Sequence, residues 1–224
     1  MDDEPELRAL SQQVRAIEPA ARLVPLRALR RAIRLSRDRG DFHTAVVHDR
    51  CWRIGRDRLF ELVFPSELRL SENDPAQEFL LIPVPDDPTS LQTKQELSRT
   101  LFHAALDRAF DEAVTADVLD PLSLRTFRES VGPAQWHSIV AVLQEENLIG
   151  EGDSTEVVLR EASAFALELQ QVQPEKWDTF FPGLDPADPF FQRLRQVLAS
   201  DRLFKLTQLP GVESQEGSLA IPVQ

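Results

Sequence analysis

The sequence contains little cysteine and no long apolar run, and each shortage excludes a class of protein. Its one cysteine, Cys51, cannot form an internal disulfide, so a disulfide scaffold is excluded and a reducing compartment is expected. No stretch approaches 18 apolar residues without charges, which predicts that no helix spans a membrane. The first residues, MDDEPELRALSQQ, lack the apolar core of a secretory signal. We therefore expect a soluble, cytoplasmic protein with no membrane partner.

Motifs of common catalytic and cofactor sites are also missing. The eight glycines are scattered, and none precedes a GK[ST] or belongs to a GxGxxG pattern, so no phosphate loop or dinucleotide site is expected. No G-x-S-x-G turn is present to hold a nucleophilic serine. The sequence therefore gives no reason to expect a cofactor.

What the sequence does contain is typical of a globular protein with unevenly distributed charge. Hydrophobic residues make up 42% and charged residues 28% of its 224 residues, which is enough for one large or two small domains. The net charge is −12, yet residues 20–58 hold eleven arginines against four aspartates. Such asymmetry is typical of a polyanion-binding face, or of two segments of one chain that attract each other.

The hydrophobic pattern predicts an α+β, mainly helical fold. Residues 4–17 and 25–40 have apolar side chains at helical spacing, and short branched or aromatic runs between Thr44 and Val84 predict a small, mostly antiparallel sheet. The stretch PVPDDPTS, residues 83–90, is the best candidate boundary. We therefore divide the chain into residues 1–88, a helical pair with a small sheet, and a helical domain that follows.

The predicted second domain, residues 89–224, begins with a helix over LQTKQELSRTLFHAALDRAFDEAVTA that is apolar on more than one face. Residues 122–159 then read as helix, tight turn, helix and a two-stranded wing, an order that resembles a winged helix-turn-helix unit. A further helix is predicted over about residues 161–171. The second helix of the winged unit lacks arginine and lysine and ends in Glu145-Glu146, so phosphate repulsion argues against DNA binding there.

Positive charge gathers on the second predicted helix and on the segment after it. The candidate binding residues are Arg27, Arg30, Arg31, Arg34, Arg37, Arg50 and Arg53. Three interpretations stay open: a solvated face or one paired with the acidic part of the chain, a docking site for a protein partner, and a nucleic-acid interface. Only Trp52 supplies an aromatic ring near these arginines, so base stacking is weakly supported.

Two histidines and the cysteine lie close together in HTAVVHDRCW, but their spacing fits no usual metal site. His43, His48 and Cys51 form the pattern H-x4-H-x2-C, and no second cysteine exists to complete a zinc site. His103 and His137 lie on separate predicted helices, and we assign them no role. No metal site is therefore expected.

Three classes of function follow, in order of preference. The first is a non-catalytic protein-interaction module or subunit of a larger assembly, because charge asymmetry is visible while catalytic motifs are not. The second is a nucleic-acid-associated regulator that uses the arginine-rich helix. The third is an enzyme of unrecognised type centred on His48 and Cys51, where neighbouring arginines would favour the thiolate.

Overall fold

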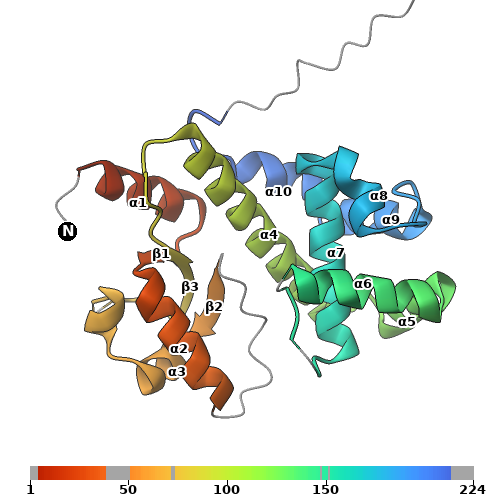
Figure 1. Ribbon diagram of the computed structural model, residues 1–224, viewed down its shortest axis with the longest axis horizontal. Coiled ribbons are helices and arrows are strands. Elements are labelled where there is room, and N and C mark those ends of the chain that lie inside the picture. The colour runs from red at the N-terminus through yellow and green to blue at the C-terminus, as the bar shows by residue number, and fades with distance from the viewer. Residues whose placement is uncertain (1–4, 39–50, 72–73, 147, 151, 213–224) are drawn as a thin grey trace, which may run out of the picture.

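The computed structural model confirms an α+β, mainly helical fold (Figure 1). It describes residues 5–38, 51–71, 74–146, 148–150 and 152–212. No helix among these residues is both long enough and apolar enough to cross a membrane.

The N-terminal half contains a three-stranded sheet covered by short helices. Its elements are α1 (Pro5–Ile17), β1 (Ala21–Val24), α2 (Leu26–Asp38), β2 (Trp52–Gly55), α3 (Arg56–Leu62), the 3-10 helix η1 (Pro65–Leu68) and β3 (Glu78–Pro83). The strand order is β1-β3-β2, with β1 parallel and β2 antiparallel to β3.

The prediction of a mostly antiparallel sheet was therefore wrong, because the sheet is mixed. Strand β1 lies in the short link between the first two predicted helices, where no strand was expected. The long connection from β1 through α2 allows β1 to run parallel to β3, as a crossover does.

One of the short runs that was expected to form a strand is helical instead. This run, LFELVF, begins inside α3, where Leu59 and Leu62 are buried three residues apart, which is helical rather than alternating spacing. The ring of Phe60 lies 5.9 Å from that of Phe79 on β3. The run TAVV, residues 44–47, lies outside the described residues.

Helices make up the C-terminal half. They are α4 (Leu91–Thr115), α5 (Pro121–Val131), α6 (Pro133–Glu145), α7 (Thr155–Val172), the 3-10 helix η2 (Pro174–Lys176), α8 (Trp177–Phe180), α9 (Pro189–Val197) and α10 (Ser200–Leu206). In Figure 1, α4 runs diagonally through the middle of the molecule and α7 lies against it. The helices α5 and α6 match the two predicted over residues 122–132 and 134–147.

The two-stranded wing predicted after α6 does not form in the described part of residues 148–159. Its expected second strand is instead the start of α7, where the Ser154 hydroxyl caps the helix by accepting a hydrogen bond from the backbone N–H of Val157. Val158, Leu159 and Ala162 are buried at helical spacing. A serine N-cap followed by this spacing is the signal that the strand prediction missed.

The hydrophobic core has three clusters of buried side chains. The largest lies among α4 to α9, and the second lies between the sheet, α2 and α3. The third joins the two halves, since Leu10 of α1 and Leu80 of β3 share it with Leu97 and Leu101 of α4. Thus α4 packs against both halves of the molecule, and α7 lies against it in the helical half.

Candidate metal centre

Four polar side chains line one face of α4 in the middle of this packing. Arg99, His103, Asp107 and Asp111 follow one another at four-residue spacing, which places them in one row along the helix. A neighbouring row of α4 is apolar, since Phe102, Leu106 and Phe110 enter the largest hydrophobic cluster. A row of charges inside a buried helix needs partners, because an unpaired buried charge is strongly destabilising.

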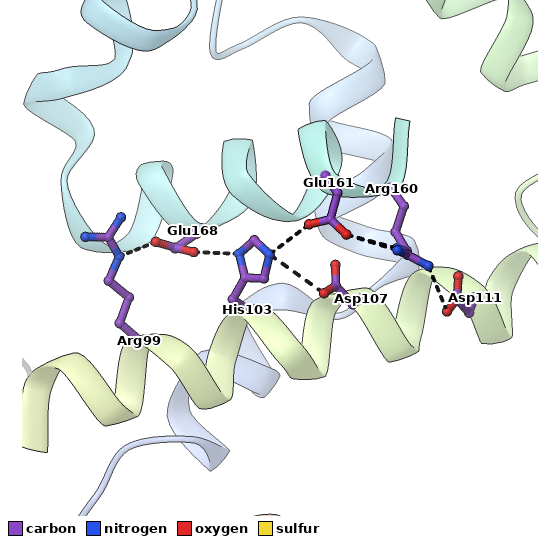
Figure 2. A network of polar contacts seen from close by, with 7 residues as sticks. All are labelled: Arg99, His103, Asp107, Asp111, Arg160, Glu161 and Glu168. Atoms are coloured by element: carbon purple, nitrogen blue, oxygen red, sulfur yellow. Dashed lines mark hydrogen bonds and ion pairs between the residues drawn. The ribbon is translucent and has the colours of Figure 1, made fainter. Parts of the chain in front are cut away.

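Helix α7 supplies the partners of this row. Glu161 and Glu168 are seven residues, or two turns, apart and therefore share a face, and Arg160 lies beside Glu161. Glu161 is 2% exposed and Glu168 is fully buried. Figure 2 shows the side chains from the two helices alternating along one line between them.

The imidazole of His103 stands at the centre and is held in one orientation. Its Nδ1 donates a hydrogen bond to Oε2 of Glu168 at 2.7 Å, and Glu168 accepts another hydrogen bond from Nε of Arg99. An ionised carboxylate can only accept, so the proton stays on Nδ1 when the imidazole is neutral. The other ring nitrogen, Nε2, faces Oε2 of Glu161 at 3.3 Å and Oδ2 of Asp107 at 3.7 Å.

These three atoms form a compact set of metal-ligand donors. One donor atom each from His103, Asp107 and Glu161 lies within 4.8 Å of the others. The Oδ1 atom of Asp107 is buried and has no hydrogen-bond partner among the residues that the structure describes. A carboxylate behind the distal nitrogen of a ligating histidine is the usual second layer of such a centre, and Glu168 occupies that place.

The electrostatics show that this cluster has an excess of negative charge. Burial first, and then the neighbouring carboxylate of Glu161, raise the pKa of Asp107 to about 7. Burial alone would lower the pKa of His103, but Asp107, Glu161 and Glu168 outweigh it and hold that pKa well above its ordinary value. The cluster therefore favours added positive charge at its centre.

Arg160 closes the cluster on the other side. Its guanidinium contacts Glu161 Oε1 at 3.0 Å and Asp111 Oδ2 at 3.6 Å. Burial alone would lower its pKa, but Glu161, Asp107 and Asp111 together raise it. The carboxylate of Glu161 thus bridges two side chains, because its Oε1 contacts Arg160 and its Oε2 faces His103.

The arginines singled out from the sequence lie far along the chain from this centre. Four of them have exposed side chains on α2, namely Arg27, Arg30, Arg31 and Arg34. Of these, Arg31 forms an ion pair with Glu67 of η1 at 2.6 Å. The side chain of Arg37 and the whole of Arg50 lie outside what the structure describes.

Arg53, the last of the predicted set, is on β2 and is held by carboxylates of its own half. It contacts Glu78 of β3 at 2.8 Å and Glu18 at 3.5 Å. Of the cluster in HTAVVHDRCW, His43 and His48 lie outside the described residues, while Cys51 is buried in the third hydrophobic cluster.

The sequence analysis missed His103, and two signals could have found it. His103 and Asp107 are one turn apart on a helix that is apolar on several faces, which is an unusual place for both residues. The helix predicted over about residues 161–171 already contains Glu161 and Glu168, and their spacing of seven residues places both carboxylates on one face.

No protein family, no curated protein and no solved structure gives a match to this chain. The interpretation of the site therefore rests on its geometry.

Proposed function

We propose that this protein binds a divalent transition-metal ion between α4 and α7, through Nε2 of His103 and one carboxylate oxygen each from Asp107 and Glu161. The observation that carries the proposal is the orientation of His103. Its Nδ1 is held by Glu168, so Nε2, which gives up its proton when a metal ion binds, is directed at two carboxylates.

The formal charge of the cluster supports a dication. The seven side chains in Figure 2 include four carboxylates and two guanidinium groups, so they carry two excess negative charges once the carboxylates are ionised and His103 has given up its second proton to act as a ligand. One divalent ion would balance them. Such a balance matters here because uncompensated charge in a low-dielectric interior is costly.

The donor set also indicates which metals to test. One imidazole nitrogen with carboxylate oxygens suits zinc, iron and manganese, whereas calcium and magnesium prefer oxygen ligands alone. Three protein ligands leave a coordination position for water, as in catalytic rather than closed structural zinc sites. Of the three ligands, Asp107 has the most exposed side chain, at 23%, so solvent reaches the proposed ion from this side.

Isothermal titration of chelator-treated protein with Zn²⁺ and Mn²⁺ tests the proposal. We expect one ion per chain. The Glu168→Gln substitution keeps the shape of the side chain but weakens the second layer, and should lower affinity about 10- to 100-fold. Glu161→Gln removes a ligand and should lower it further.

Two other histidines provide the controls. His137→Ala on α6 removes an exposed imidazole and should leave the affinity unchanged. His48→Ala tests the cluster near Cys51 in the same way. A titration without stoichiometric binding, or with binding that Glu161→Gln leaves intact, contradicts the proposal.

As a second candidate function, we propose that α2 docks an acidic surface of a protein partner. The observation in its favour is the exposure of Arg27, Arg30, Arg31 and Arg34 on one 13-residue helix. Arginine forks bind carboxylates in a bidentate manner, and such a surface also steers association electrostatically. A nucleic acid is the alternative partner, because its phosphates could contact the same arginines.

Fluorescence anisotropy separates these two occupants. Labelled duplex and single-stranded oligonucleotides should bind weakly, and a labelled glutamate-rich peptide more tightly, with both losing affinity as salt rises. The paired substitutions Arg27→Ser and Arg34→Ser should remove peptide binding, whereas Arg202→Ser on α10 should not. Tight oligonucleotide binding would instead favour the nucleic-acid alternative, and no binding of either probe would reject this function.

A further inference from the structure

A cavity of about 550 Å³ opens at the end of the polar cluster, between the C-terminal part of α4, α5 and the start of α7. Its apolar lining includes Phe110 and Val114 of α4, Leu124 of α5, and Val157 and Leu159 of α7. Val114 is one of the few large hydrophobic side chains that are exposed, at 37%. The size and the apolar lining are those of a small-molecule site.

Arginines from two helices contribute to the lining of this cavity. Arg125 and Arg128 of α5 line it together with Arg160, the arginine at the end of the cluster in Figure 2. Arg128 stacks over the ring of Trp136, 5.4 Å from its centroid. In the part of the chain that the structure describes, neither Arg125 nor Arg128 pairs with a carboxylate.

The start of α7 adds to the positive electrostatic potential in the cavity. The 18-residue helix begins at the cavity wall, and the Ser154 cap accepts from Val157 rather than from the first two N–H groups of the helix. A helix N-terminus carries partial positive charge. Two acidic residues, Asp111 and Glu156, also line the cavity, but Asp111 is occupied with Arg160.

We infer that this cavity binds a small organic anion with an apolar body, such as a medium-chain carboxylate. The anionic group would lie against Arg125 and Arg128, and the chain would lie on Phe110, Val114 and Leu124. A cavity with this apolar lining but without the arginines would accept a neutral ligand. A site with the arginines but without the apolar lining would accept any anion. The combination selects a molecule that has both parts.

Three probes separate the two contributions in a calorimetric titration of the whole protein. Octanoate has the charge and the chain, octan-1-ol has the chain alone, and acetate has the charge alone. We expect saturable binding of octanoate at one site, and at least about tenfold weaker binding of the other two, because octan-1-ol loses a charged hydrogen bond and acetate loses the burial of an apolar chain. The experiment does not depend on a metal ion and is run in the presence of chelator.

Two variants locate the binding. Arg125→Gln combined with Arg128→Gln should weaken octanoate about tenfold or more while leaving octan-1-ol unchanged. Val114→Trp should fill the cavity and weaken both, and the exposure of Val114 makes the larger side chain tolerable. Arg202→Gln on α10 is the matched control. Octanoate binding that is absent, or that neither variant alters, overturns the inference.

Discussion

Replacing Asp107 with asparagine should stabilise the metal-free protein at alkaline pH, although it removes a ligand. The pKa of Asp107 is raised to about 7, by burial first and by Glu161 next, from an ordinary value of 3.8. Above pH 7 the folded protein must therefore hold a carboxylate that is less stable than it is in the unfolded chain. Asparagine keeps the shape of the side chain and removes that charge.

The magnitude follows from the size of the pKa difference. About three pKa units at 1.36 kcal/mol each amount to a cost on the order of 4 kcal/mol. Because the folded pKa is the higher one, the folded state binds the proton more tightly, and stability falls as pH rises from about 4 to about 7. The advantage of Asp107→Asn should be small near pH 4 and reach its full size above pH 7.

Urea unfolding at pH 4.5 and pH 8.5, with chelator present, measures this difference. The matched control is Asp111→Asn, one turn further along α4, whose carboxylate is 61% exposed and whose substitution should change stability by less than about 0.5 kcal/mol. If Asp107→Asn destabilises the protein at pH 8.5, then the ion pair with His103 stabilises Asp107 more than burial and Glu161 destabilise it, and the reasoning is refuted.

Three other substitutions test the fold. Phe165→Ala should lower the free energy of unfolding by about 3–5 kcal/mol in urea, because its ring is fully buried between α7 and α8. Arg22→Met should cost about 3–5 kcal/mol by leaving Asp74 buried without its partner. Since Arg22 lowers the pKa of Asp74, that loss should shrink as pH falls through the folded pKa of Asp74. Ser90→Ala should cost about 1 kcal/mol in a thermal melt by removing the cap of α4.

The parts of the fold that sequence reasoning predicted are those in which one helical signal dominates. The segment of α1 has leucines at helical spacing after Pro5, and α4 has apolar residues on several faces after a serine cap. Strand β3, a run of branched side chains, was also expected. Strand β1 was missed because its four residues, ARLV, follow no alternating pattern and are strand only through pairing with β3.

The candidate site could not be predicted from the sequence for a different reason. His103 and Glu168 are 65 residues apart, and nothing in either segment alone specifies that α4 and α7 lie side by side. The arginines of α2, in contrast, stand out in the sequence because they are close together. Local charge density is easy to read, whereas a cluster assembled from two helices depends on tertiary packing.

The position of α4 links events in one half of the molecule to stability in the other. One face of this helix packs with α1 and β3 through Leu97 and Leu101, and another packs with the helical half through Phe102 and Leu106. An ion held by His103 would stabilise α4, and the amide protons of β3 should then exchange more slowly with solvent although β3 contains none of the ligands. The sheet would report on the occupancy of a site that it does not touch.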